Sequence, residues 1–296
     1  MKLSAKYLFS GILIGLVLLM AFLASFPDGK LHITFCNVGQ GDAAYIRFPN
    51  NSDMLIDGGP DDKVLSCLGR YMPFYDRTID MVVLSYPQKD HLQGLISVVQ
   101  RYNIQYFVIG VEGNETEGYR KLIDNISKKN IVVKNLYQGD ELRMGEVKVA
   151  LLWPTRQFVA ANVPTEELNN GAKLGLATKT DLSSFSYFMN IQYGKFSALF
   201  TGDGDNKIQP EILRTVDLPK VDVLKVPHHG SAASLMPEFL DKIQPNMAIL
   251  SVGKNGYGYP SIEALNLLRE KGTKLKRTDK DGDVEVVSDG RGWVVN

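Results

Sequence analysis

Four short polar segments of this sequence each follow an apolar run, and each contains aspartate or histidine. They are residues 55–59, 85–94, 200–205 and 226–231. Three of the four histidines in the chain lie in two of these segments, which a random surface distribution would rarely produce. Imidazole nitrogens and carboxylate oxygens are the ligands that zinc-like ions take, usually four at a time. The joint pattern predicts that the segments meet in one metal site.

The candidate ligands are two aspartates and three histidines from these segments. They are Asp90, His91, Asp203, His228 and His229. Asp90, His91, Asp203 and one residue of the pair His228/His229 would supply two oxygens and two nitrogens, and the sequence does not decide which of the pair is the ligand. A divalent ion held in this way lowers the pKa of a bound water to about 7 and makes a nucleophile at neutral pH. Asp90, His91 and Asp203 are therefore also the candidate catalytic residues.

Each of these residues also has a purely structural interpretation when it is taken alone. Asp57 precedes two glycines and could cap a turn through its carboxylate, and Asp203 could do the same in its own loop. Asp90 and His91 could cap the helix that follows them. The strand-end histidine pair is harder to explain in this way, because polar rings are costly to bury without partners. The shared site explains all of them together.

The segments that must position these residues follow one order twice. From residue 31 to about 140, and again from about 141 to 296, hairpins come first and strand–helix units follow. Residues 92–102 have helical spacing of their apolar side chains. The order favours an α/β fold of four layers, in which two mixed sheets pack together and helices cover them outside. The polar, irregular residues 155–180 are expected to form a long loop.

The N-terminus has a different composition. Residues 7–26 carry no charge and follow Lys2 and Lys6. About 20 apolar residues can cross a bilayer as a helix, and the flanking lysines favour a cytoplasmic N-terminus. We therefore expect residues 1–29 to be a membrane anchor or signal segment, and residues 30–296 to form a domain outside the cytoplasm. A cleaved signal peptide is the alternative. A single-pass anchor in the cell membrane is favoured, because the sequence lacks a clean cleavage site.

Charge and cysteine content set further limits. Lysine plus arginine equals aspartate plus glutamate at 33 each, which gives no support to a generally nucleic-acid-binding surface. Cys36 and Cys67 are the two cysteines. A disulfide between them is permitted outside the cytoplasm, but a chain of this size does not need one, and two buried thiols are the simpler expectation.

Six motifs occur in a distinctive order between about Leu31 and Asp289. They are FCNVGQGDAAYIRFP, MLIDGG, VVLSYPQKDHLQGL, ALFTGD, VDVLKVPHHGS and YGYPS. In order and spacing they resemble the metallo-β-lactamase-like domain of the ComEC family of DNA-uptake competence proteins. The resemblance implies a four-layer α/β/β/α metallo-β-lactamase-like sandwich, here preceded by one N-terminal transmembrane helix. It also implies a metal-dependent hydrolase ancestry and a link to DNA processing outside the cytoplasm. Only one candidate span is present in this sequence, so a DNA channel is not implied.

Carried over residue by residue, the resemblance implies half of a dinuclear metal site. The metal loop of the superfamily reads H-x-H/D-x-D-H, and its last two positions match Asp90 and His91. Its first two positions, which serve the other ion, are Tyr86 and Gln88 here. Asp203 matches the acid that bridges the two ions in the superfamily. One ion has therefore lost ligands, while the other keeps a nearly complete set.

Two further positions depart from the family pattern. Tyr259 stands where the usual GHPS motif has its histidine, and Asn37 stands where an aspartate is usual. The loss of one ion removes the clamp that two ions place on the attacking and leaving oxygens of a phosphodiester. Two hypotheses remain open. In the first, one zinc or manganese ion supports weak, nuclease-like hydrolysis of DNA or another phosphodiester. In the second, no metal is bound and the domain is a non-catalytic subunit that binds protein partners in a surface assembly.

Overall fold

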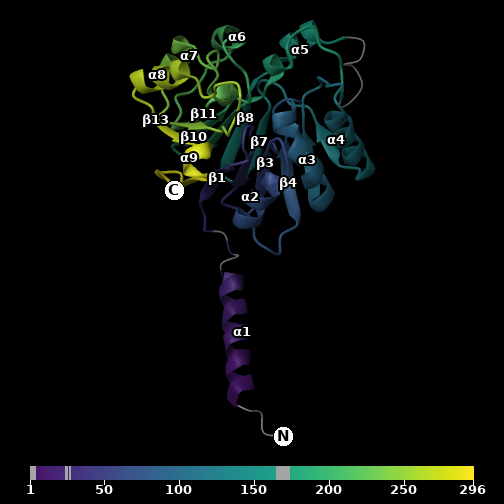
Figure 1. Ribbon diagram of the computed structural model, residues 1–296, viewed down its shortest axis with the longest axis vertical. Coiled ribbons are helices and arrows are strands. Elements are labelled where there is room, and N and C mark those ends of the chain that lie inside the picture. The colour runs from purple at the N-terminus through teal and green to yellow at the C-terminus, as the bar shows by residue number, and fades with distance from the viewer. Residues whose placement is uncertain (1–4, 24–25, 27, 165–173) are drawn as a thin grey trace.

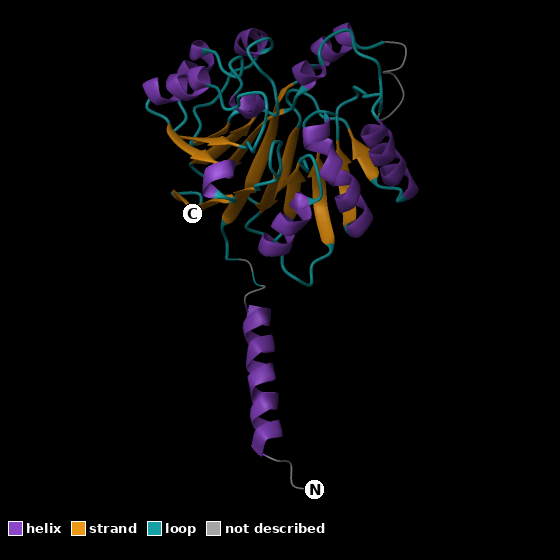
Figure 2. Cartoon of the chain, viewed as in Figure 1, coloured by secondary structure: helices purple, strands orange, loops and turns teal. Residues whose placement is uncertain are grey.

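The structure is a computed structural model of the 296-residue chain, and it describes residues 5–23, 26, 28–164 and 174–296. Two β-sheets pack face to face, and helices cover their outer faces (Figures 1 and 2). This arrangement confirms the predicted four-layer α/β/β/α class. It arises because strands with apolar residues on both faces must be covered on both sides.

The first sheet has the strand order β15-β14-β1-β2-β3-β4-β5-β6. Its strands are β1 (Leu31–Phe35), β2 (Ala44–Arg47), β3 (Asp53–Ile56), β4 (Thr78–Val83), β5 (Asn103–Val108), β6 (Val132–Lys134), β14 (Val284–Ser288) and β15 (Trp293–Val295). The helices α2 (Lys63–Tyr71), α3 (Lys89–Arg101) and α4 (Glu117–Lys128) bury their apolar sides against its outer face.

The second sheet has the strand order β13-β12-β11-β10-β9-β8-β7. Its strands are β7 (Glu141–Met144), β8 (Val147–Trp153), β9 (Phe188–Tyr193), β10 (Phe196–Phe200), β11 (Val223–Lys225), β12 (Met247–Leu250) and β13 (Lys274–Arg277). Its outer face packs against α6 (Gln209–Thr215), α7 (Pro237–Ile243) and α8 (Ile262–Glu270). The remaining short helices are α5 (Arg156–Asn162), α9 (Thr278–Asp281) and the 3-10 turns η2 (Leu182–Phe185) and η3 (Pro227–Gly230).

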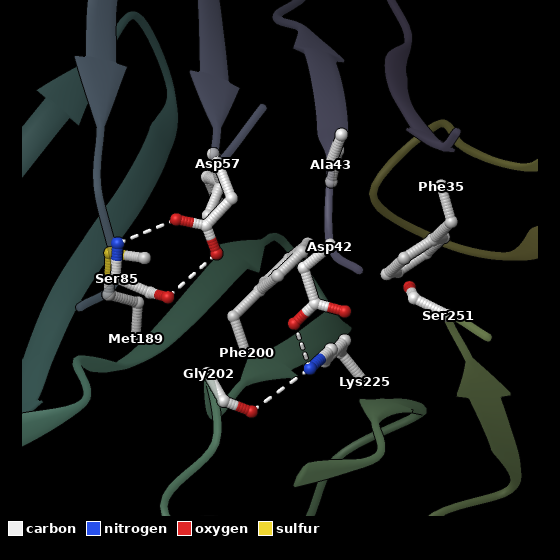
Figure 3. A pocket seen from close by; sticks show the side chains of 12 residues that line it. Phe35, Asp42, Ala43, Asp57, Ser85, Met189, Phe200, Gly202, Lys225 and Ser251 are labelled. Atoms are coloured by element: carbon white, nitrogen blue, oxygen red, sulfur yellow. Dashed lines mark hydrogen bonds and ion pairs between the residues drawn. The ribbon is translucent and has the colours of Figure 1, made fainter. Parts of the chain in front are cut away.

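The main core lies between the two sheets. Alternate residues of β1, such as Ile33 and Phe35, face it from the first sheet, and Val149 and Ile191 face it from the second. Alternation arises because successive side chains of a strand point to opposite faces. At one end of this core, side chains from both sheets surround a small cavity of about 10 Å³ (Figure 3). The polar segments of the sequence meet there, because parallel strands place their carboxyl ends at one edge of a sheet.

The two stretches that the sequence divides near residue 141 correspond to the two sheets, with one exception. β14 pairs with β1, so β14 and β15 belong to the first sheet. The expectation of a long loop over residues 155–180 is met only in part. The stretch 155–180 is not simply a loop, because it contains α5 and precedes η2. The side chain of Thr155 caps α5 by accepting a hydrogen bond from the backbone of Phe158. Residues 165–173 of that stretch lie outside the described residues.

The N-terminal helix α1 spans Ala5–Leu23. Its described apolar side chains, Ile12, Leu13 and Val17 among them, are exposed. In the described residues, no helix has both the length and the apolar character needed to cross a membrane. The transmembrane helix expected over residues 7–26 is therefore not confirmed.

A disulfide joins Cys36, just after β1, to Cys67 in α2. The simpler expectation of two free buried thiols is therefore wrong. Both sulfur-bearing residues are buried, and their Cα atoms are 5.9 Å apart, a normal separation for a disulfide. The bridge links α2, in the outer helical layer, to the end of β1 in the first sheet.

Replacing both cysteines by alanine is expected to lower the free energy of unfolding by about 3 kcal/mol, because the bridge restricts the unfolded chain across a separation of 31 residues. Urea denaturation of the full chain without reductant measures the difference. The wild type in reductant is the control and should match the double variant. Equal denaturation midpoints for the oxidised wild type and the variant would contradict the stabilising role.

Candidate metal centre

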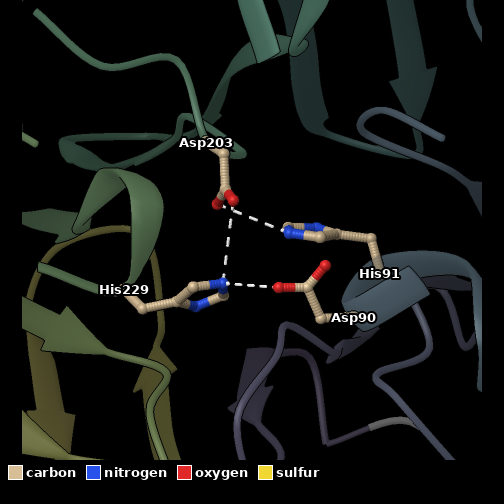
Figure 4. Close-up of side chains that lie close together, drawn as sticks. All are labelled: Asp90, His91, Asp203 and His229. Atoms are coloured by element: carbon tan, nitrogen blue, oxygen red, sulfur yellow. Dashed lines mark hydrogen bonds and ion pairs between the residues drawn. The ribbon is translucent and has the colours of Figure 1, made fainter. Parts of the chain in front are cut away.

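Four side chains from both halves of the chain converge at the edge of the sheets where the polar segments meet, called the polar edge below. Asp90, His91, Asp203 and His229 each offer one ligand atom, and these atoms all lie within 4.8 Å of one another (Figure 4). The Nε2 atom of His91 is 3.4 Å from Oδ1 of Asp203. The Nε2 atom of His229 is 3.7 Å from Oδ2 of Asp203 and 3.2 Å from Oδ2 of Asp90. Three of the four residues are buried, and Asp90 faces the solvent in part.

Asp90 and His91 lie in the first turn of α3, which follows β4. The N-cap of this helix is Gln88, and no side-chain capping bond is found among the described residues. The cap interpretation of Asp90 and His91 is therefore wrong, because both residues are already helical. The helix instead turns the His91 ring completely into the interior and leaves the Asp90 carboxylate at an open cleft on the surface, described below.

The ambiguity between the two adjacent histidines is decided by the backbone of η3. His228 and His229 have φ angles of +48° and +52°. Residues other than glycine adopt this left-handed conformation rarely and at a cost of about 1 to 3 kcal/mol each. The consequence is that the two rings diverge. His229 is 1% exposed and belongs to the cluster, while the His228 side chain is 30% exposed and its Nδ1 lies 3.5 Å from Oδ2 of Asp205. His228 is not part of the group of four.

Both imidazoles of the cluster are oriented by a hydrogen bond at Nδ1, the ring nitrogen that points away from Asp203. The Nδ1 atom of His91 is 2.8 Å from Oδ2 of Asp57, and the Nδ1 atom of His229 is 2.8 Å from the carbonyl oxygen of Ser251. A carbonyl or carboxylate oxygen only accepts, so each Nδ1 carries the proton in its bond. Each Nε2 atom then faces Asp203. This use of the outer nitrogen is typical of metal-binding histidines, because it fixes the ring and its tautomer.

The donor set fits a divalent metal ion. Nε2 of His91 and Oδ1 of Asp203 are buried, and neither atom has a hydrogen-bond partner among the described residues. Buried polar atoms without partners are costly, and an ion between them would satisfy both. Two imidazole nitrogens and two carboxylate oxygens form a shell that zinc or manganese accepts. Asp90, His91, Asp203 and His229 are the residues that would hold it.

Asp57 has a role that the turn-cap interpretation missed. Its φ angle is +59°, and its carboxylate accepts hydrogen bonds from the backbone and the hydroxyl of Ser85 at 2.7 and 2.6 Å. The same carboxylate accepts from His91. Asp57 therefore orients a candidate ligand. The only signal in the sequence was its position after an apolar strand, directly before two glycines.

Asp42 and Lys225 were not identified from the sequence as site residues. Both are buried and form an ion pair, and Nζ of Lys225 also donates to the carbonyl oxygen of Gly202 at 2.9 Å (Figure 3). Nζ lies 3.8 Å from Oδ1 of Asp203, and Oδ1 of Asp42 lies 3.3 Å from Nδ1 of His229. A lysine inside the apolar strand VDVLKV was the available signal, because lysine is almost never buried without a partner.

The charges of this cluster shift one another's pKa. Burial alone would raise the pKa of Asp42, but the Lys225 ammonium and the His229 imidazole bring it down to about 2. Burial alone would lower the pKa of His229, but the carboxylates of Asp203 and Asp42 raise it to about 10. Without metal, the histidines of the centre are therefore protonated and balance the acids. A metal ion must displace these protons when it binds.

Tyr86 occupies the other side of Asp203. Its hydroxyl donates to Oδ2 of Asp203 at 2.6 Å, and its ring packs edge-on against His91 with centroids 4.5 Å apart. Burial and the Asp203 carboxylate raise the pKa of Tyr86 well above its usual value, so the phenol keeps its proton. Tyr86, Gln88 and Tyr259 line a cleft of about 380 Å³ in front of the centre.

No family model matches the sequence, but three competence and recombination proteins are similar to it. ComE operon protein 3 of Bacillus subtilis is 24% identical over 287 residues, which are 91% of this chain and 34% of that protein. Recombination protein 2 of Haemophilus influenzae is 25% identical, over 84% of this chain and 28% of that protein. Competence protein ComA of Neisseria gonorrhoeae is 26% identical, over 94% of this chain and 36% of that protein. The resemblance to the ComEC family is confirmed. The chain spans about a third of the length of these relatives.

Solved structures support the fold alone. The metallo-β-lactamase fold protein YhfI of Bacillus subtilis matches with a TM-score of 0.51 at 14% identity, over 86% of this chain and 99% of that one. CmlA, a diiron β-hydroxylase of Streptomyces venezuelae, matches with a TM-score of 0.51 at 14% identity, over 86% of this chain and 53% of that one. The chain therefore has a metallo-β-lactamase-like fold, it resembles ComEC-family proteins in sequence, and it contains a His/Asp group suited to metal.

Replacing Lys225 by methionine is expected to lower the free energy of unfolding of the metal-free chain by about 3 kcal/mol, because the buried Asp42 carboxylate then loses the ammonium group that lowers its pKa most. Adding Asp42→Asn removes that charge and should restore much of the loss. Urea denaturation in the presence of a chelator measures both variants. Asp42→Asn alone, which instead removes the carboxylate partner of the Lys225 ammonium group, is the matched control. Unchanged stability of Lys225→Met would contradict the role of the ion pair.

Proposed function

We propose that this chain is a metal-dependent phosphodiesterase of the ComEC type, with one divalent ion and weak activity, held outside the cytoplasm. The observation that carries the proposal is the convergence of four possible ligands, Asp90, His91, Asp203 and His229. Both imidazoles among them are oriented by hydrogen bonds at Nδ1. A zinc or manganese ion bound there supplies a Lewis acid and a bound water of lowered pKa. The names of the relatives, with their competence and recombination roles, favour DNA as the phosphodiester.

The surroundings of Asp203 support one ion rather than two. Tyr86 donates its hydroxyl hydrogen to Oδ2 of Asp203 and so occupies an oxygen that a second ion would need. Gln88 and Tyr259, which stand at two other positions where the family has ligands, are also neutral side chains that line the cleft. Neutral amide and phenol groups are poor substitutes for imidazole or carboxylate as ligands of such ions. The protein groups that remain there can donate hydrogen bonds to a substrate but add no positive charge.

Weak hydrolysis follows from that arrangement. Asp90 and His229 face the cleft, so a substrate can approach the ligand group from the solvent side. Charge that builds on the leaving oxygen, however, has no second ion beside it. Electrostatic stabilisation of this kind is typically worth on the order of 3 kcal/mol, or about a hundredfold in rate. The fold therefore favours slow cleavage.

One observation favours a second candidate function. Lys225 and the protonated histidines neutralise the acids internally, so the centre is balanced in charge when it holds no ion. Such a domain would remain folded without metal and could act as a non-catalytic interaction or scaffold subunit of a surface assembly. Metal content separates the two functions.

The test measures metal content and cleavage of single-stranded DNA in the same preparations of the full chain in detergent. The wild type should retain at most one zinc or manganese ion after dialysis and should cleave slowly. Tyr86→His with Gln88→Asp should raise both values, because it restores a second set of ligands. Asp90→Ala should abolish metal binding and cleavage together, and Tyr106→Ala, an exposed tyrosine on β5, is the matched surface control.

Three outcomes would change this conclusion. Two retained equivalents in the wild type would refute the single-ion site. Fast wild-type cleavage that Asp90→Ala abolishes would show a fully competent enzyme. No metal and no cleavage in the wild type would favour the scaffold function.

The location is also proposed from the chain's own features. The disulfide between Cys36 and Cys67 is of a kind that persists in oxidising compartments and is rare in the cytosol. The exposed apolar side chains of α1 would be covered if residues 7–26 attach the chain to the cell membrane. These features support the proposal that residues 1–29 attach the chain to the membrane and that residues 30–296 lie outside the cytoplasm.

In cells that express the full chain, it is expected in the membrane fraction, and protease added to spheroplasts should degrade the domain. A cytoplasmic protein of similar size, protected in the same spheroplasts, is the control. Full protection of the domain would place it inside the cell. A soluble mature form that begins near Phe26 would show a cleaved signal peptide instead of an anchor.

A further inference from the structure

A row of rings leads from the metal centre to the surface of the cleft. The rings of His229 and His228 have centroids 6.3 Å apart, and those of His228 and Tyr259 are 5.7 Å apart. The ring of Tyr257 follows at 5.6 Å from Tyr259, inclined by 30°. All four residues line the same cleft. The row therefore starts at a candidate ligand and ends at Tyr257, which is 74% exposed.

The loop that carries the two tyrosines is held by one side chain. The Oδ1 atom of Asn255 accepts hydrogen bonds from the backbone N–H groups of Tyr257 and Tyr259, at 3.0 and 3.1 Å. Its Nδ2 atom donates to the carbonyl oxygens of Gly253 and Tyr259, at 2.8 and 2.9 Å. The tyrosines are thus presented from an ordered loop, which reduces the entropy lost when a ligand binds.

His228 gains a role in this row that the metal group does not give it. Its left-handed backbone directs the ring into the cleft, where it meets Tyr259 edge-on. Strained residues of this kind are concentrated at functional sites, where the surrounding structure maintains them. The same strain that turns His229 inward therefore adds His228 to the aromatic wall.

The charges of the cleft indicate how a ligand would bind. Asp90, Asp181 and Asp203 line it, and none of the described residues that line it is lysine or arginine. An anionic chain therefore finds no basic groove there, in keeping with the neutral composition of the chain. Apart from an ion at the centre, the feature of the wall that suits a nucleic acid is its exposed aromatic surface. Tyrosine rings stack on the bases of single strands with little dependence on sequence.

We propose that His228, Tyr259 and Tyr257 form a stacking surface for an unpaired nucleobase, next to a phosphodiester held at the metal centre. This inference rests on the proposed function and narrows its substrate to single-stranded nucleic acid. A paired base is already stacked within its duplex and does not present a free face to the wall. The wall orients the strand, and the centre holds the phosphate.

The test is binding of a fluorescent oligothymidylate and of an abasic strand of equal length, by anisotropy, to the full chain in detergent with Mn²⁺. Both strands carry the same phosphates, so their difference reports the bases. The wild type should bind the oligothymidylate about fivefold tighter or more, the lower end of what stacking of one base provides. Tyr257→Ala should remove most of the difference, and Tyr257→Phe should keep it, because the phenyl ring still stacks. Tyr106→Ala, on β5 and 42% exposed, should change nothing.

The outcomes separate this inference from the proposed function. Equal, Mn²⁺-dependent binding of both strands by the wild type would overturn the stacking surface and leave the metal-dependent function intact. A preference for bases that needs no Mn²⁺ and disappears in Tyr257→Ala would support the surface and count against the metal-dependent function. If neither strand bound, both the stacking surface and the proposed function would be overturned. A preference that survives Tyr257→Ala would place the base elsewhere and overturn the inference.

Discussion

Carboxylates that lie together away from water must be balanced by positive charge, and this constraint governs the polar edge of the molecule. The carboxylates of Asp42, Asp57 and Asp203 are all buried. Those of Asp57 and Asp203 both lie close to His91, and that of Asp42 pairs with Lys225. Isolated charges of this kind are too costly to bury, so the chain brings Lys225 and two imidazoles to the same place. Asp42 lies just before β2 and Asp57 just after β3 of the first sheet, whereas Lys225 is the last residue of β11 in the second. The ion pair therefore joins the two sheets at the point where their strands end, in addition to the apolar core between them.

The same constraint explains why the centre suits metal and is also balanced without it. When no ion is bound, protons on the histidines provide the positive charge, as the raised pKa of His229 shows. An ion can replace those protons, and the outer bonds from His91 to Asp57 and from His229 to Ser251 keep both rings in place during the exchange. Because the oriented rings exist before binding, little rearrangement is needed. Tyr86 donates to the other oxygen of Asp203 at 2.6 Å, which is the contact on which the proposal of one ion rests.

A strained backbone directs two adjacent histidine side chains to different places, His229 to the metal centre and His228 to the cleft. His229 reaches the buried carboxylate of Asp203, while the adjacent His228 packs against Tyr259 in the cleft. The left-handed conformations of His228 and His229 make this arrangement, and Gly230 continues it at a φ angle of +77°. A methyl group at Gly230 would approach Leu250 to 2.6 Å, so the sharp turn also depends on the absence of a side chain there. Local strain is thereby coupled to the geometry of both proposed binding regions.

The amino-acid sequence by itself determined the layers of the fold and most of the centre. The alternation of apolar and polar residues, together with the strand-end positions of Asp90, His91 and Asp203, is a local property that short segments display. Only the tertiary structure decided that His229 rather than His228 joins the cluster, because the difference lies in backbone angles and not in residue type. The pairing of Asp42 with Lys225, the bond from Tyr86 to Asp203 and the Cys36–Cys67 bridge likewise appear only when distant segments meet. The addition of β14 to the first sheet is a contact of the same kind. Each of these features depends on which segments share an edge or a layer, and local periodicity carries no information about that choice.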